Sequence, residues 1–122
     1  MRFIKSLSYA WQGIKYCFRV ERNFRIQVMI VLIACVFAIV LKIGTNEWIA
    51  ILFCWALVLG LEMINTAIEK LSNVVSTSIH PDIKVIKDVA AGAVFLVSII
   101  SLAIACIIFL PKIYPFIKNI FE

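Results

Sequence analysis

The stretch VAAGAVFLVSIISLAIACIIFL, residues 89–110, contains no charged side chain. An α-helix rises about 1.5 Å per residue, so this stretch is long enough to cross a hydrocarbon layer of roughly 30 Å. Two more apolar segments precede it, and the three predicted spans are residues 25–43, 48–70 and 86–110. We therefore expect an all-α membrane protein with three transmembrane helices.

The composition of the whole chain agrees with this expectation. Of its 122 residues, 64% are hydrophobic and 16% are charged, and the mean hydropathy is +1.06. These values lie outside the usual range of soluble globular domains. We expect residues 1–122 to form one integral membrane domain. No secretory signal is expected, because the first apolar run begins only after residue 25 and lacks a small-residue cleavage site.

Lysine and arginine gather on one side of the predicted spans, the side that holds the N-terminus and the 70–88 loop. These cations are Arg2, Lys5, Lys15, Arg19, Arg22, Arg25, Lys70, Lys84 and Lys87. Cytoplasmic flanks of membrane proteins are rich in lysine and arginine, so we expect both regions to face the cytoplasm from the inner membrane. The net charge of +5 suits anionic lipid head groups, and we expect no nucleic-acid binding.

The N-terminal segment, residues 1–22, is amphipathic. Phe3, Leu7, Trp11 and Phe18 recur at helical spacing, while most of the cations fall on the other side. Such a pattern predicts a helix that lies flat on the membrane surface. The helix is either an anchor alone or an anchor that also brings Arg2 and Tyr9 to a binding site, and the spacing leaves both possibilities open.

Two familiar kinds of site are missing from the sequence. The four cysteines form no CxxC pair and have no histidine at ligand spacing, so we expect them to be packing residues. They are Cys17, Cys35, Cys54 and Cys106. The four glycines form neither GxxxxGK[ST] nor GxGxxG, so any nucleotide site must be built from side chains.

A polar stripe interrupts the second span within LEMINTAIEK, residues 61–70. Glu62 and Glu69 are seven residues apart and therefore share one helix face, which Asn65 and Thr66 flank and Asn73 continues. The Asn65 amide and the Thr66 hydroxyl are explained equally well as groups that form hydrogen bonds between helices. An ionisable Glu62 inside a span costs several kcal/mol and indicates a functional site, for which a general base is the natural role.

Two more acids lie at the same cytoplasmic side. Glu21 stands at the junction before the first span, and Asp88 follows Lys87 at the start of the third. Asp88 is equally explained as a helix cap, and Glu21 as an ion-pair partner of its arginine neighbours. Taken together with Glu69, these side chains could hold Mg²⁺ through oxygen ligands while a lysine neutralises phosphate.

Three segments resemble the signature segments of the small bacterial membrane lipid kinases, the prokaryotic diacylglycerol kinase and undecaprenol kinase family. They are ERNFR at 21–25, EMINTAIE at 62–69 and HPDIKVIKDVAAGAV at 80–94. The resemblance runs from Arg2 to about Ala105. It implies a homotrimer in the bacterial inner membrane that uses ATP and Mg²⁺ to phosphorylate a lipid alcohol, with sites shared between neighbouring subunits.

The resemblance also implies a role for each matching residue. Glu62 would be the general base, with Asn65 beside it at the lipid substrate, and Glu21 and Glu69 would hold the metal with ATP. The implied nucleotide-binding residues are Arg2, Tyr9, Glu21, Glu69, His80, Lys87 and Asp88. The chain departs from the pattern at Asn73, where many relatives carry Asp.

The expected function is therefore ATP-dependent phosphorylation of a membrane lipid alcohol. Thr66 and the KDVAAGAV segment look more like the undecaprenol kinase branch of the family, and this resemblance slightly favours undecaprenol over diacylglycerol as the acceptor. A small transporter or channel that uses Glu62 as a proton or cation site is the alternative, and a purely structural subunit is a third possibility.

Overall fold

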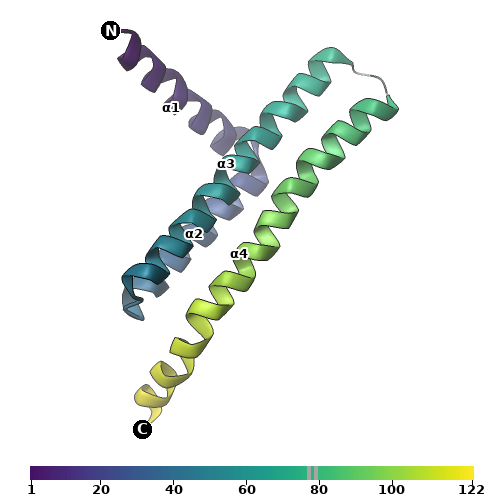
Figure 1. The fold of residues 1–122 in the computed structure, drawn as a ribbon. Coiled ribbons are helices and arrows are strands. Elements are labelled where there is room, and N and C mark those ends of the chain that lie inside the picture. The colour runs from purple at the N-terminus through teal and green to yellow at the C-terminus, as the bar shows by residue number, and fades with distance from the viewer. Residues whose placement is uncertain (77, 79) are drawn as a thin grey trace.

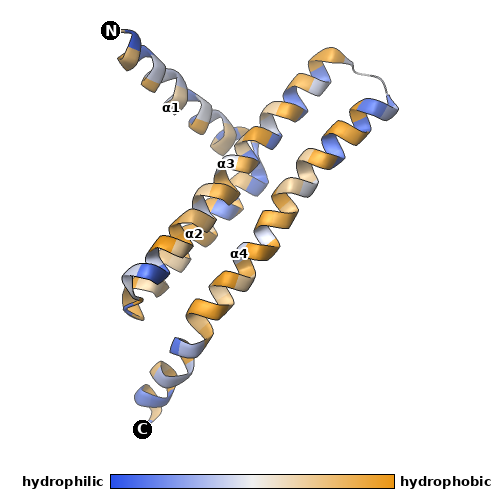
Figure 2. Cartoon of the chain, viewed as in Figure 1, coloured by the Kyte–Doolittle hydropathy of each residue, from blue (hydrophilic) through white to orange (hydrophobic). Residues whose placement is uncertain are grey.

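The computed structural model describes residues 1–76, 78 and 80–122, and four helices make up nearly all of this part of the chain (Figure 1). They are α1 (Arg2–Val20), α2 (Arg22–Val40), α3 (Thr45–Val75) and α4 (Pro81–Phe121). Helices α2, α3 and α4 are each long and apolar enough to cross a membrane. Figure 2 shows hydrophobic residues along most of their length. The predicted all-α fold with three candidate spans is confirmed.

Helices α1 and α2 are separated by a single residue, Glu21, which adopts an extended conformation with φ −99° and ψ 111°. The chain changes direction there, and α1 leads away from the other helices (Figure 1). The Arg25 guanidinium donates to the carbonyl oxygens of Phe18 and Arg19 at 3.0 and 2.8 Å. A cation therefore satisfies the free carbonyls at the end of α1, where the helix dipole is negative.

The turn between α2 and α3 has the hydrogen bonds of a Schellman motif. The Ile43 N–H donates to the Ala38 carbonyl and the Lys42 N–H to the Ile39 carbonyl, both at 3.2 Å. Lys42 has φ 53°, the left-handed conformation that this motif places just after the helix. Glu47 accepts from the Gly44 N–H at 3.1 Å and thereby caps the start of α3.

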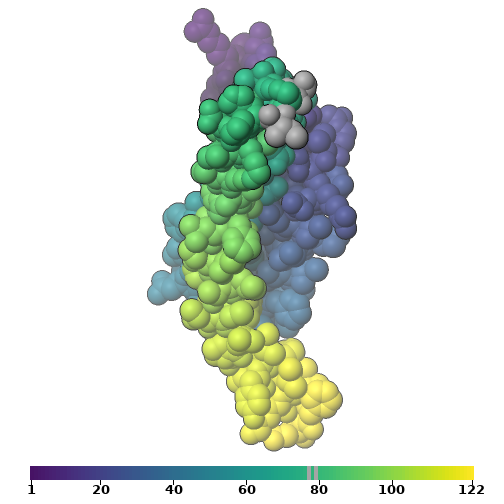
Figure 3. Space-filling view, turned by 90° about the vertical axis from the view of Figure 1, so that its right-hand side faces the viewer, coloured from purple at the N-terminus to yellow at the C-terminus, as the bar shows by residue number. Residues whose placement is uncertain are grey.

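Helices α3 and α4 form a long antiparallel hairpin (Figure 1). At about 1.5 Å per residue, the 41 residues of α4 extend about 60 Å, roughly twice the hydrocarbon thickness. In Figure 3, α4 runs along the length of the molecule, with α2 and α3 behind it. At the end opposite the hairpin loop, Lys112 of α4 pairs with Glu47 of α3 at 3.1 Å.

The two halves of the molecule bury different kinds of side chain. Near the α2–α3 turn the buried cluster is apolar and contains Ala38, Ile43, Ile51 and Ile108. Trp48 and Trp55 pack edge to face beside it, with ring centroids 6.4 Å apart. Toward the hairpin loop the buried residues of α3 are mostly polar, namely Glu62, Asn65, Thr66 and Ser72. The polar half positions the candidate site.

Candidate functional site

Glu62 lies on α3 at the place where α1, α2 and α3 meet, and it is 2% exposed. Gln27 of α2 donates from Nε2 to Glu62 Oε2 at 3.5 Å. One turn further along α3, the Thr66 hydroxyl donates to the backbone carbonyl of Glu62 at 3.0 Å. No cation pairs with Glu62 in the part of the chain that the structure describes. A carboxyl group is thus enclosed with a neutral amide as its direct side-chain partner.

Asn65 links this region to the second acid of the stripe. Its Nδ2 donates to Glu69 Oε1 at 3.5 Å, and Asn65 is 8% exposed. The Asn65 Oδ1 atom and the Gln27 Oε1 atom are both buried, and neither has a hydrogen-bond partner among the described residues. Buried polar atoms in proteins nearly always have a partner. These two oxygens can therefore accept from a hydroxyl group or water that enters the site.

A buried thiol lies near two of the acids of this region. Cys17 of α1 is buried next to Thr66 and lies within electrostatic range of Glu21 and Glu62. Burial raises the pKa of the Cys17 thiol above its ordinary value, and the two nearby carboxylates act in the same direction. The thiol is therefore neutral near pH 7 and adds no further negative charge between Glu21 and Glu62.

Glu21 and Glu69 both lie close enough to Glu62 to act on it electrostatically. Within residues 1–76, 78 and 80–122, no group of three His, Cys, Asp or Glu side chains could hold a metal ion. Carboxylate oxygens are nevertheless the ligands that Mg²⁺ prefers, and Mg²⁺ commonly takes one or two carboxylates plus substrate phosphates. The donor set of Glu21 and Glu69 fits a magnesium ion that arrives with a nucleotide.

An apolar groove lies between α3 and α4 beside this region. Its volume is about 410 Å³, and Asn65 is the polar residue of its wall. The groove is lined by Leu61, Ile64, Asn65, Ile68, Val85, Ile86, Val89, Ala90 and Ala93. A hydrophobic channel with a single amide suits a molecule that is mostly hydrocarbon and has one polar end.

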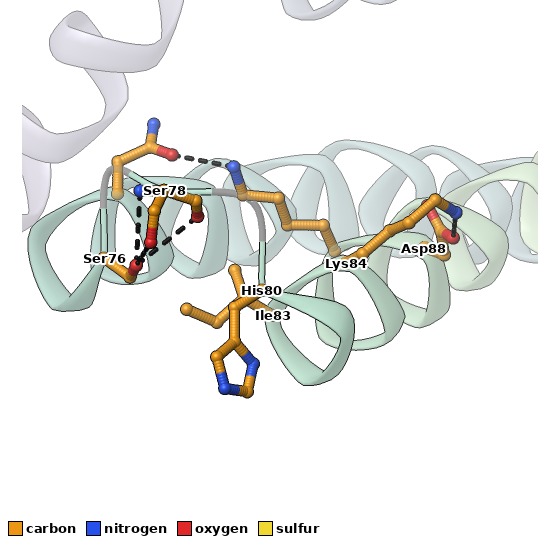
Figure 4. Close-up of a pocket in the computed structure, with 8 residues that line it drawn as sticks. Ser76, Ser78, His80, Ile83, Lys84 and Asp88 are labelled. Carbon is orange, nitrogen blue, oxygen red and sulfur yellow. Dashed lines mark hydrogen bonds and ion pairs between the residues drawn. The ribbon is translucent and has the colours of Figure 1, made fainter.

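A second, polar pocket lies at the loop end of the α3–α4 hairpin, with a volume of about 270 Å³. We call it the hairpin pocket, and it is lined by Asn73, Ser76, Ser78, His80, Ile83, Lys84, Lys87 and Asp88 (Figure 4). The Lys87 ammonium donates to Asn73 Oδ1 at 2.7 Å, and Lys84 pairs with Asp88 at 2.6 Å. Asn73 stands one helical turn beyond Glu69, so the hairpin pocket continues the polar face of α3.

His80 has a structural role in this pocket. Its Nδ1 atom accepts from the Asp82 backbone N–H at 3.2 Å and caps the first turn of α4, which begins with Pro81. A proline at the first helical position needs no hydrogen-bond partner for its nitrogen. The cap and the proline together fix where α4 starts, and they hold the turn that carries Lys84 and Lys87.

The single chain brings most, but not all, of the predicted site residues together. Glu21, Glu62, Asn65 and Glu69 gather where α1, α2 and α3 meet, and His80, Lys87 and Asp88 gather at the hairpin pocket. Arg2 and Tyr9 are exposed on α1. That helix leads away from the hairpin loop, so the chain does not bring them to the pocket (Figure 1).

Two residues of the site were missed in the sequence analysis. Gln27 contacts Glu62, and its signal is visible in the sequence, because it is the one amide in the apolar segment 26–41. Lys84 contacts Asp88, and its signal is the four-residue spacing that places two side chains on one helix face. Neither signal identifies the partner before the helices are placed.

Comparison with known proteins agrees with the resemblance in the sequence. Residues 8–109 match the family model described as prokaryotic diacylglycerol kinase. An undecaprenol kinase of Bacillus subtilis is 36% identical over 112 residues, which is 92% of this chain and 91% of that protein. A diacylglycerol kinase of Synechocystis is 34% identical over 109 residues, which is 88% of this chain and 62% of that protein.

A diacylglycerol kinase of Escherichia coli is 28% identical over 107 residues, which is 88% of each chain. The matched region, residues 8–109, includes Glu62, Glu69 and the hairpin pocket as well as most of the length of α1 and α4. The matches favour a lipid kinase over a transporter or a structural subunit. The chain therefore belongs to the prokaryotic diacylglycerol kinase family and is a multi-pass membrane lipid kinase.

Proposed function

We propose that this kinase transfers the γ-phosphoryl group of Mg-ATP to the hydroxyl of a membrane lipid alcohol, with Glu62 as the general base. The observation that carries the proposal is the enclosure of Glu62, which is 2% exposed in an apolar helix and has the neutral Gln27 as its partner. An ionisable group at such a place indicates function by default. A carboxylate without a cation partner can accept a proton from the acceptor hydroxyl.

The lipid alcohol is proposed to approach from the groove between α3 and α4. The groove is apolar, and Asn65 in its wall carries an oxygen that lacks a partner among the described residues. The hydrocarbon part of the acceptor would remain in the groove and the bilayer, while its hydroxyl meets Asn65 and Glu62. The membrane itself would then orient the acceptor, which removes much of the entropic cost of bringing two substrates together.

The nucleotide is proposed to occupy the polar end of the site, on the cytoplasmic side, where the N-terminus also lies. Glu21 and Glu69 would hold Mg²⁺ with ATP, and Lys87 and Asp88 would contact the nucleotide. When bound, the metal ion neutralises charge on the transferred phosphoryl group. Arg2, Tyr9 and His80 complete the proposed nucleotide region. A neighbouring subunit of a homotrimer would supply Arg2 and Tyr9, because α1 leads away from the α3–α4 hairpin of its own chain (Figure 1).

The proposed reaction is a direct displacement at phosphorus. The acceptor oxygen forms a bond to the γ-phosphorus, the bond from that phosphorus to the bridging oxygen breaks, and ADP leaves. Glu62 takes the proton of the hydroxyl, and Lys87 offsets the negative charge of the phosphates. Phosphoryl transfer needs mainly alignment and charge neutralisation, and both can be supplied by these side chains.

Undecaprenol is slightly favoured over diacylglycerol as the acceptor. Thr66 and the KDVAAGAV segment support this preference, and an undecaprenol kinase is 36% identical to the chain. The test is to incubate the purified protein in lipid with labelled ATP and magnesium, adding each alcohol separately. We expect faster labelling of undecaprenol. Labelling of neither alcohol would contradict the proposed function, and faster labelling of diacylglycerol would reverse the preference.

The role of Glu62 is tested by the Glu62→Gln variant. The amide keeps the size of the side chain but cannot take up the proton, so we expect kcat to fall by about 10²–10⁴. Nucleotide binding, measured by equilibrium titration, should be retained. Glu47→Gln makes the same change at the other end of α3 and should leave kcat nearly unchanged. Normal turnover by Glu62→Gln would remove the general-base assignment.

A further inference from the structure

The two lysines of the hairpin pocket have partners of different charge. Lys84 is paired with the carboxylate of Asp88 at 2.6 Å. Lys87 donates instead to the amide oxygen of Asn73 at 2.7 Å. Each ammonium is held by one short bond, but only the first is neutralised by its partner.

The charges that line the pocket therefore do not cancel. Lys84 and Lys87 contribute two positive charges and Asp88 contributes one negative charge, which leaves one positive charge. The His80 ring accepts a hydrogen bond at Nδ1, as a neutral imidazole does. The remaining positive charge belongs to Lys87, whose ammonium points across the hairpin from α4 to α3.

The amide of Asn73 orients this ammonium without cancelling its charge. A free lysine side chain loses up to about 2 kcal/mol of rotamer entropy when it is fixed. A hydrogen bond that already fixes it lowers the cost of engaging an anion. An aspartate at position 73 would also fix the side chain, but it would compete with the incoming phosphate for the same ammonium.

We propose that Asn73 is a positioning residue for nucleotide binding, which presents Lys87 as an uncompensated cation to the phosphates of a nucleoside triphosphate. The inference rests on the proposed function in one respect, the contact of Lys87 with the nucleotide. Asn in place of Asp leaves the pocket one charge more positive.

The decisive variant is Asn73→Asp, assayed by steady-state kinetics at low and at high salt. We expect the KM for Mg-ATP to rise by about three- to tenfold at low salt, with kcat unchanged, because the new carboxylate neutralises Lys87. The increase should shrink at high salt, because ions screen an exposed pair. Asn73→Ala leaves the positive charge of Lys87 unneutralised but removes the hydrogen bond that orients it. We therefore expect a smaller increase in the KM for Mg-ATP, and this increase should persist at high salt.

Asn46→Asp is the matched control, because it makes the same substitution on the same helix at the end remote from the hairpin pocket. It should leave the KM for Mg-ATP unchanged. An unchanged KM for Mg-ATP in Asn73→Asp would overturn the positioning role. A KM that rises equally at both salt concentrations, together with a lower unfolding midpoint, would also overturn it, because the variant would then act through a loss of stability.

Lys87→Met separates this inference from the proposed function. If Lys87→Met raises the KM for Mg-ATP and Asn73→Asp does not, the positioning role is wrong and the nucleotide contact of Lys87 stands. If Lys87→Met itself leaves the KM unchanged, the proposed nucleotide contact is wrong, and the role of Asn73 is overturned with it.

Discussion

At the scale of the residue, the contact between Gln27 and Glu62 can be kept whether the Glu62 carboxyl group is ionised or protonated. The Gln27 amide donates from Nε2 to the carboxylate, while its Oε1 atom lacks a partner among the described residues. A rotation of the amide would present Oε1 to a protonated Glu62, which then donates the hydrogen bond. One neutral side chain can thus hold the Glu62 carboxyl group both in its ionised and in its protonated form.

This contact gives a prediction for Gln27→Leu. Leucine removes both the donor and the acceptor, so the Glu62 carboxyl loses its partner from α2. We expect kcat to fall by about tenfold, as for the loss of one hydrogen bond to a charged group, with the KM for Mg-ATP little changed. Gln12→Leu on the exposed face of α1 is the control in the same kinetic assay. Equal rates for the two variants would show that Gln27 does not position Glu62 for the reaction.

The sequence predicts some of these residues better than others. Glu62 could be identified because a carboxylate within an apolar run is unusual whatever lies around it. The bond from Gln27 to Glu62 joins residues 35 positions apart and depends on how α2 packs on α3. The bond from Lys87 to Asn73 likewise exists only when the hairpin closes. The roles of the predicted site residues remain predictions.

At the scale of the element, the turn between α2 and α3 carries a conformational cost. Lys42 occupies the left-handed region with φ 53°, which disfavours residues that have a Cβ atom. The surrounding hydrogen bonds from Lys42 and Ile43 fix this conformation. The turn is therefore stabilised by its backbone pattern, and the side chain at position 42 weakens it.

We accordingly predict that Lys42→Gly stabilises the fold. Glycine adopts positive φ without a Cβ clash, and the expected gain in the free energy of unfolding is about 1 kcal/mol. The measurement is unfolding in mixed micelles as the denaturing detergent increases. Lys42→Ala removes the same charge but keeps a Cβ atom, so it should show no comparable gain. A gain of equal size in both variants would attribute the effect to the lost charge.

Element bounds were harder to predict than the elements themselves. The apolar runs indicated three helices, but α3 continues to Val75 and α4 runs from Pro81 to Phe121, beyond the spans predicted at 48–70 and 86–110. Apolar patterning marks the part of a helix that meets hydrocarbon, whereas backbone hydrogen bonding continues into the head-group region and water. The end of α1 at Val20 depends on Arg25, which lies in the next helix.

At the scale of the whole molecule, large hydrophobic side chains are exposed along every helix. Lipid can cover such surfaces, and so can other copies of the chain. Helix α1, which carries Arg2 and Tyr9, leads away from the α3–α4 hairpin of its own chain (Figure 1). Both observations suit an assembly in which α1 of one subunit approaches the hairpin of another, and the homotrimer remains a prediction.

Shared sites lead to a prediction for mixed assemblies. Arg2→Ala and Lys87→Met should each lower activity strongly, because each removes a cation from the proposed nucleotide region. If neighbouring subunits supply these residues to one site, subunits exchanged in detergent should regain activity well above that of either variant. Each variant taken through the same exchange alone is the control. If the activity of the mixed assemblies stays at the average of the two variants, each site is built within one chain.

The enclosure of Glu62 also bears on which nucleophile the enzyme can use. Water is the most abundant hydroxyl donor in a cell, and a base that is open to solvent would activate it against ATP. Glu62 is 2% exposed, so bulk water has little access to its carboxylate. Excluding solvent from a reactive site suppresses hydrolysis. In the proposed mechanism, ATP at the hairpin pocket would therefore be conserved until a lipid alcohol reaches Glu62, and futile turnover would be avoided.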